Sequence, residues 1–126
     1  MVPLVAVVDD DVSVRKSLDR LIRSVRLGVK VFESAEDFLN SAPPLKPDCL
    51  ILDVSLPGMT GIELHHRLLA SKSNVPTIFI TAHRSDELAK LGTASDWIVA
   101  YFIKPFSADE LLDAVNVALK WTSAGG

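Results

Sequence analysis

The sequence lacks several features that would place it in other classes of protein. Cys49 is its only cysteine, which excludes an internal disulfide and suits a reducing compartment. No apolar run approaches the roughly 18 residues needed to cross a bilayer. The N-terminus also lacks the basic region and cleavage site of a secretory signal. We therefore expect a cytoplasmic protein that makes no membrane contact.

Basic residues are also fewer than acidic ones. The 13 Lys and Arg residues against 16 Asp and Glu give a formal net charge of -3, which does not support direct binding to nucleic acid or an anionic membrane. Neither a GxGxxG nor a GxxxxGK motif is present, which argues against nucleotide binding. The length of 126 residues and the hydrophobic content of 48% suffice for one core. We expect one domain over residues 1–122, with 123–126 as a tail or the start of a linker.

The chain is organised around a short apolar run, Cys49-Leu50-Ile51-Leu52, that ends in a carboxylate, Asp53. An uninterrupted apolar run of this length is typical of a strand buried on both faces in a parallel sheet. A Pro57-Gly58 turn follows, and Thr60 with Glu63 forms a capping box that predicts a helix start. Asp53 is therefore predicted at the carboxyl edge of a central strand, where open α/β sheets place their ligands.

Apolar strand patterns alternate with amphipathic helix patterns along the whole chain. Strands are predicted at residues 4–8, 29–32, 49–52, 77–80 and 98–103. Helices are predicted at residues 12–27 with Gly28 closing the first of them, 34–41, 60–71, 85–91 and from Ser107 onward. This alternation predicts an α/β fold: a flavodoxin-like, doubly wound (βα)5 sandwich with a five-stranded parallel sheet. Of the two common doubly wound strand orders, 2-1-3-4-5 matches the strand count.

Polar side chains stand at the ends of four predicted strands. They are Asp9 and Asp10 after the first, Asp53 after the third, Thr81 after the fourth and Lys104 after the fifth. These ends share one edge of a parallel sheet, so the side chains can converge. Crowded carboxylates repel one another unless a cation neutralises them, and oxygen ligands of this kind suit Mg²⁺. With the metal present, one carboxylate can accept a phosphoryl group, which predicts an aspartyl-phosphate site.

Four motifs resemble the response-regulator receiver domain of two-component signalling over essentially the whole length. They are Val8-Asp9-Asp10-Asp11, the stretch from Leu52 to Gly61, Ile80-Thr81-Ala82-His83 and Ile103-Lys104-Pro105-Phe106. Each motif alone is weak evidence, but the four stand in the family's order at compatible spacing. The segments at residues 12–18 and 79–83 are most similar to the FixJ-type subgroup.

The resemblance implies a role for each residue of the acidic cluster. Asp53 would be the phosphoacceptor, and its partner would be a sensor histidine kinase carrying a phosphohistidine. Asp9, Asp10 and Asp53, together with the main-chain carbonyl of Ser55, would hold Mg²⁺. The domain would not be an enzyme beyond phosphorylating and dephosphorylating itself.

The resemblance also implies the parts of a switch. Thr81, Ala82, Lys104 and Tyr101 would form the phosphate-binding and switch residues, and the Lys104-Pro105 bond would be cis. Tyr101 would turn inward when Thr81 moves toward the phosphoryl group. The face from the fourth helix to the fifth would then change shape and form a homodimer. Any contact with DNA would belong to a transcriptional output domain absent from this chain.

Three other interpretations remain open at this point. A phosphatase of the haloacid dehalogenase class also uses an aspartate after a strand, but it needs a second acid where this chain has Ser55. A flavin-binding module would need a phosphate loop in place of three aspartates that repel phosphate. A receiver-shaped module that binds partners without phosphorylation would keep its partner affinity after Asp53→Asn.

The segment from Leu91 to Val99 departs from the family pattern. Receivers commonly carry a small Gly-Ala pair before the last strand, whereas this chain has Trp97 there, and the stretch between Thr81 and Lys104 is slightly long. Trp97 would either pack beneath a lengthened turn or reshape dimerisation. The adjacent His65 and His66 would face different directions on a helix, so we expect solvated or partner-facing roles for them.

Overall fold

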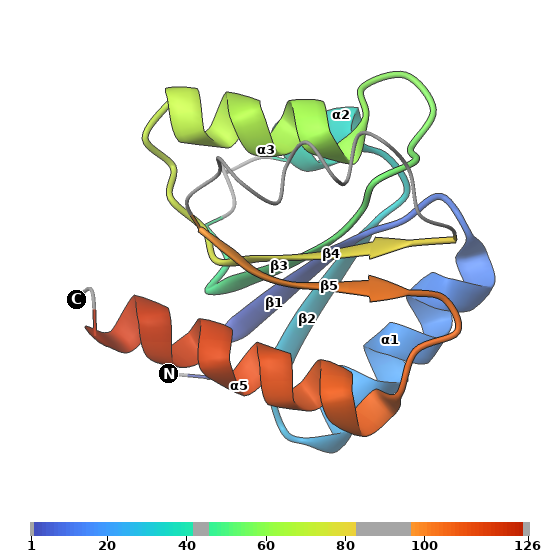
Figure 1. Ribbon diagram of the computed structural model, residues 1–126, viewed down its shortest axis with the longest axis vertical. Coiled ribbons are helices and arrows are strands. Elements are labelled where there is room, and N and C mark those ends of the chain that lie inside the picture. The colour runs from blue at the N-terminus through green and yellow to red at the C-terminus, as the bar shows by residue number, and fades with distance from the viewer. Residues whose placement is uncertain (1, 42–45, 83–96, 125–126) are drawn as a thin grey trace.

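The computed structural model describes residues 2–41, 46–82 and 97–124 and contains one parallel sheet of five strands (Figure 1). The strands are β1 Leu4–Val8, β2 Gly28–Phe32, β3 Cys49–Asp53, β4 Thr77–Thr81 and β5 Ile98–Ile103. Their order is β2-β1-β3-β4-β5, and every pairing is parallel. This confirms the predicted fold class and strand order.

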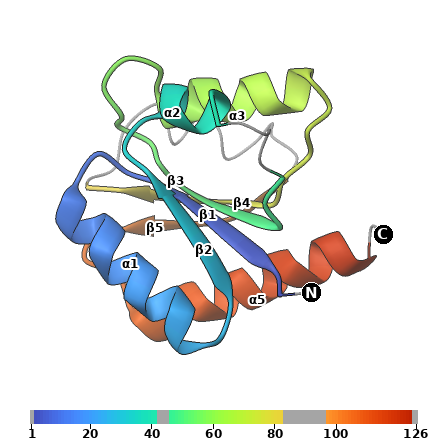
Figure 2. The ribbon, with the colours of Figure 1, turned by 180° about the vertical axis from the view of Figure 1, so that it is seen from behind.

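Four described helices cover the two faces of the sheet. They are α1 Val12–Ser24, α2 Ala35–Leu39, α3 Gly61–Ala70 and α5 Ala108–Ala124. The helices α1 and α5 lie on one face, and α2 and α3 lie on the other (Figures 1 and 2). The helix predicted at residues 85–91, like His83, lies outside the described residues. No helix in the described part of the chain has the length and apolar character to span a bilayer.

Successive strand residues point to opposite faces and build two cores. In β1, Ala6 and Val8 pack beneath α2 and α3, while Val5 and Val7 pack with α1 and α5. Every residue of β3 and β4 is buried, as expected for strands covered on both sides. Cys49 belongs to this core, where burial raises the pKa of its thiol to about 12. It is a packing residue, as predicted.

Three helices begin at the capping residues that the sequence indicates. The hydroxyl of Ser34 accepts the N–H of Asp37, that of Thr60 accepts the N–H of Glu63, and that of Ser107 accepts the N–H of Glu110. Each bond satisfies a backbone donor that has no partner within the helix. These local bonds set where each helix starts, and hence how each strand connects to it.

The predicted end of the first helix is wrong. Helix α1 stops at Ser24 rather than near Gly28, and it is Arg26 that takes a left-handed backbone conformation (φ 64°) after the helix. Gly28 is instead the first residue of β2, because its N–H donates to the carbonyl of Pro3 at 2.9 Å. The hydrogen bond to Pro3, rather than the conformational freedom of Gly28, decides where the strand begins after the helix.

The last strand contains an irregularity near its start. Thr77 pairs with Ile98 and Ile78 pairs with Ala100, so Val99 is an extra residue in β5. Just before it, Trp97 has a left-handed backbone (φ 70°), and its carbonyl accepts the N–H of Thr77 at 2.8 Å. Its ring meets that of Trp121 on α5 edge to face, with centroids 6.3 Å apart.

The adjacent histidines of α3 differ in environment. His66 is exposed, but His65 is buried, with its ring 5.4 Å from that of Phe79 in an edge-to-face contact. The expectation of a solvated or partner-facing role is therefore wrong for His65. Its position on the helix, next to Leu64 and three residues before Leu68, turns it toward the sheet.

Candidate functional site

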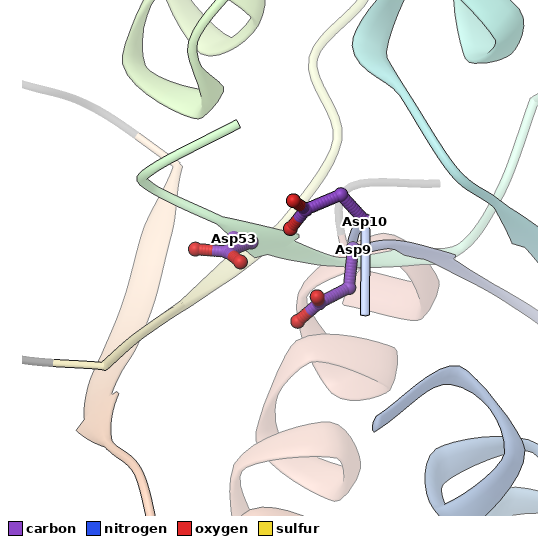
Figure 3. A group of neighbouring side chains, drawn as sticks. All are labelled: Asp9, Asp10 and Asp53. Carbon is purple, nitrogen blue, oxygen red and sulfur yellow. The ribbon is translucent and has the colours of Figure 1, made fainter. Parts of the chain in front are cut away.

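Three carboxylates meet at the carboxyl ends of β1 and β3. Asp9 and Asp10 follow β1, and Asp53 is the last residue of β3, the neighbouring strand. One oxygen from each lies within 4.8 Å of the others (Figure 3). Asp9 and Asp53 are buried, whereas Asp10 is exposed. The strand order brings together the acidic residues that the sequence singled out.

Lys104 reaches this cluster from the end of β5. Its Nζ lies 2.9 Å from Oδ2 of Asp9 and 3.4 Å from Oδ2 of Asp53. Burial of the Lys104 side chain lowers its pKa, but the hydrogen bond to Asp9 and the charges of Asp53 and Asp9 outweigh this, and the net pKa is raised. The lysine therefore stays protonated, and its ammonium is shared between Asp9 and Asp53.

The surroundings of Asp9 disfavour the ionised form of its carboxylate. Its side chain has no exposed area, and this burial raises the pKa of Asp9 above the ordinary value of 3.8, as does the negative charge of Asp53. The hydrogen bonds from Lys104 and from the main-chain N–H of Asp11, at 2.8 Å, act in the opposite direction. Burial therefore disfavours the charged form of Asp9, and a cation bound beside it would favour that form.

Asp53 is fixed by the backbone around it. The N–H of Ser55 donates to its Oδ1 at 2.9 Å, and the N–H of Val54 donates to the carbonyl of Ile80 at 2.9 Å. Helix α3 begins directly over the end of β3: a Cβ on Gly61 would collide with the main-chain carbonyl oxygen of Asp53. Glycine at position 61 is what allows the helix to approach this closely.

The remaining predicted residues lie along the same edge or beside it. Thr81 is the last residue of β4 and is buried, and its carbonyl accepts the N–H of Lys104 at 2.8 Å. Ala82 follows it and is exposed. Tyr101 lies on β5 with 37% of its surface exposed, and its ring stacks on that of Phe79 at 6.3 Å. The Lys104-Pro105 bond is cis, as the resemblance implies.

The sequence did not predict two further contacts near the site. Arg15, which the helical pattern assigns to the polar face of the first helix, donates from Nη1 to the main-chain carbonyl of Asp9 at 2.7 Å. Glu36 on α2 accepts the N–H of Met59 at 3.2 Å, next to Gly58, whose φ is 73°. The signal for Arg15 was its spacing: a residue one helical turn after the cap Asp11 can reach back over the acidic turn.

The cluster has the composition of a site for a hard cation. All three side chains offer carboxylate oxygens, with no nitrogen or sulfur ligand in the group that the described residues form. Small divalent cations such as Mg²⁺ take one or two protein carboxylates and keep several waters, which the exposed position of Asp10 allows. The donor set therefore fits the metal that the sequence suggested.

Comparison with known proteins identifies the family. The model of the response regulator receiver domain matches residues 5–116. Nodulation protein W of Bradyrhizobium diazoefficiens is 43% identical over 115 residues, covering 91% of this chain and 50% of that protein. The transcriptional regulatory protein FixJ of the same organism is 37% identical over 118 residues, covering 90% of this chain and 55% of that protein.

Solved structures agree with the sequence comparison. The structure titled FixJ-N has a TM-score of 0.80 at 34% identity and covers 95% of both chains. The response regulator StyR has a TM-score of 0.82 at 38% identity, with 98% of this chain and 62% of that one covered. This chain spans about half the length of the curated relatives that it matches. It belongs to the response regulator receiver domain family, the signalling domain of two-component systems, and is similar to FixJ and related regulators.

Proposed function

We propose that this domain is a phosphorylation-activated switch in which Asp53 accepts a phosphoryl group from a sensor histidine kinase. The observation that carries the proposal is the surroundings of Asp53: a buried carboxylate at the end of a central strand, with Asp9, Asp10 and the ammonium of Lys104 around it. A nucleophilic carboxylate needs opposite charge nearby to stay ionised and to receive a dianionic group.

The metal in this proposal is Mg²⁺, held by the carboxylates of Asp9, Asp10 and Asp53 and by the main-chain carbonyl of Ser55. When bound, the ion would neutralise the crowded carboxylates and polarise the oxygens of the transferred phosphoryl group. The N–H of Ser55 already donates to Asp53, so the backbone after β3 runs close to the carboxylate. That proximity supports the carbonyl as a fourth ligand.

In the transfer step, a carboxylate oxygen of Asp53 attacks the phosphorus of the kinase phosphohistidine. An O–P bond forms as the N–P bond breaks, and the imidazole nitrogen leaves with the electron pair and takes a proton from solvent. Lys104 then pairs with the added negative charge, as an ammonium already 3.4 Å from Asp53 is placed to do. Outside this reaction and the loss of its own phosphoryl group, the domain performs no catalysis.

The switch in this proposal runs from Asp53 to the outer strand. The Thr81 hydroxyl and the Ala82 main chain bind the phosphoryl oxygens, and Tyr101 turns inward from its exposed position. The face that includes β5 and α5 then forms a homodimer; the fourth helix, which the sequence predicts as part of this face, lies outside the described residues. Because curated relatives of about twice this length include transcriptional regulators, we propose a transcriptional output through a separate domain, which alone would contact DNA. The single buried Cys49 suits the cytoplasm, where we place the protein.

Incubation with acetyl phosphate and Mg²⁺, followed by mass spectrometry of the intact protein and its peptides, tests the proposal. We expect a mass gain confined to Asp53 that is lost in Asp53→Ala and in the isosteric control Asp53→Asn. Continuous release of phosphate from unrelated esters would favour a phosphatase instead. Unchanged partner affinity in Asp53→Asn, with no mass gain in the unsubstituted chain, would favour a binding module that works without phosphorylation.

A further inference from the structure

The side chain of Arg15 on helix α1 reaches back to the acidic turn at residues 9–11 that precedes the helix. Arg15 Nη1 donates to the main-chain carbonyl of Asp9 at 2.7 Å. The arginine is half-buried, unlike its exposed helix neighbours Lys16 and Arg20. A short, charge-assisted hydrogen bond to a carbonyl at the edge of a buried cluster restricts the backbone more than a neutral one would.

This bond completes a set of contacts on both sides of Asp10. Before it, the N–H of Asp9 donates to the carbonyl of Phe32 at 3.1 Å, and the carbonyl of Asp9 accepts from Arg15. After it, the N–H of Asp11 donates to Oδ1 of Asp9 at 2.8 Å. Asp10 is exposed, so packing restricts its side chain little, and the backbone at residues 9–11 sets the direction in which the side chain leaves the main chain.

We infer that Arg15 is a positioning residue for the metal site: it holds the Asp9–Asp11 turn so that the carboxylates of Asp9 and Asp10 stay directed at Asp53. The inference rests on the proposed function and names a residue that supports it from outside the cluster. Groups that orient metal ligands are worth about 10- to 100-fold in affinity when they are lost. Arg15 acts through the main chain of Asp9 and touches none of the reacting atoms.

The direction in which removing Arg15 changes the affinity for Mg²⁺ distinguishes a positioning role from a purely electrostatic one. A guanidinium near the cluster repels a divalent cation, so if Arg15 acted only as a charge, removing it would tighten Mg²⁺ binding. If it positions the turn, removing it weakens binding, because the ion must then order the turn as it binds. The two roles therefore predict opposite changes in the dissociation constant of Mg²⁺.

The experiment compares Arg15→Gln with Arg20→Gln, which removes the same charge from an exposed position of the same helix. Isothermal titration calorimetry with Mg²⁺ measures the dissociation constant, and amide hydrogen exchange measures protection of the Asp11 N–H in metal-free protein. We expect Arg15→Gln to raise the dissociation constant about tenfold and to speed exchange at Asp11, and Arg20→Gln to do neither.

Two results would overturn the role of Arg15 and leave the proposed function standing. One is Mg²⁺ binding by Arg15→Gln that is as tight as, or tighter than, binding by the unsubstituted chain. The other is unchanged exchange at Asp11. Failure of the unsubstituted chain to bind Mg²⁺ would instead contradict the proposed function itself, and the metal-free exchange measurement would still report whether Arg15 holds the turn.

Discussion

Lys104 and Asp9 are 95 residues apart in the chain, yet Nζ of the lysine lies 2.9 Å from Oδ2 of the aspartate. The same ammonium lies 3.4 Å from Asp53. Lys104 is thus shared between a carboxylate proposed to hold metal and the carboxylate proposed to be phosphorylated. New negative charge on Asp53 would compete with Asp9 for this lysine, and the end of β5 would follow the lysine.

Substituting Lys104 with Ala should separate phosphorylation from its consequence. We expect Lys104→Ala to accept some phosphoryl group from acetyl phosphate in the presence of Mg²⁺, because Asp53 and the metal ligands remain. It should not dimerise on phosphorylation, because the ammonium that pairs with the new charge and joins it to the end of β5 is gone. Light scattering after size-exclusion chromatography measures this, with Lys30→Ala on β2 as the control. Phosphate-dependent dimerisation equal to that of the unsubstituted chain would contradict the prediction.

The stability of the metal-free protein should depend on pH through Asp9. Its pKa is raised above 3.8, mainly by burial, so the folded chain binds this proton more tightly than the unfolded chain. The contribution of Asp9 to the free energy of unfolding is therefore fully present below pH 3.8 and is lost as the pH rises through the raised pKa. Urea unfolding with a chelator, compared between the unsubstituted chain and Asp9→Asn, should show this loss only in the former. Parallel pH profiles for the two proteins would rule it out.

Magnesium should reverse that trend. Saturating Mg²⁺ at about a hundred times its dissociation constant adds about 2.7 kcal/mol to the free energy of unfolding by mass action. Because the ion needs an ionised Asp9, this increment should shrink as the pH falls through the raised pKa of that residue. Thermal melts with Mg²⁺ and with a chelator measure the increment. Asp10→Asn should reduce it at every pH, and an increment that grows toward acidic pH would contradict the assignment.

Gly61→Ala should destabilise the fold and disturb Asp53 together. The added Cβ collides with the carbonyl oxygen of Asp53, a backbone atom that cannot move aside, so α3 must shift. We expect a loss of about 1–3 kcal/mol, the usual cost of overpacking, and slower phosphorylation. Gly28→Ala is the control. A Cβ on Gly28 would lie 3.4 Å from its nearest neighbour, the Pro3 carbonyl oxygen, and the backbone of Gly28 is not left-handed. Equal stability losses for the two variants would show that the crowding at Asp53 is relieved without cost.

The Trp97–Trp121 contact should contribute measurably to stability. Edge-to-face aromatic pairs are worth about 0.5–1.5 kcal/mol beyond the area they bury. A double-mutant cycle with Trp97→Ala, Trp121→Ala and the double variant should return a coupling energy in this range by chemical denaturation. Additive losses from the two single substitutions would mean that the rings are neighbours without energetic coupling.

Most of the fold was readable from local patterns. The buried runs of β3 and β4, the caps Ser34 and Thr60, and the polar strand ends each depend on residues within a few positions of one another. Such patterns report backbone preference and burial directly. The sequence-based predictions were wrong where a contact with a distant residue decided the structure. The hydrogen bond from Gly28 to Pro3 makes Gly28 part of β2, and the ring contact with Phe79 stabilises His65 in the core.

The candidate site divides in the same way. The amino-acid sequence alone specifies which side chains end the strands. It also predicts that Asp9, Asp10, Asp53, Thr81 and Lys104 share one edge of a parallel sheet, because strand direction places all carboxyl ends together. The bridge from Lys104 to Asp9 and Asp53, and the bond from Arg15 to the Asp9 carbonyl, appear only in the folded chain. Those contacts depend on the order of strands and the path of α1, which no short stretch of sequence encodes because each partner lies on a different element.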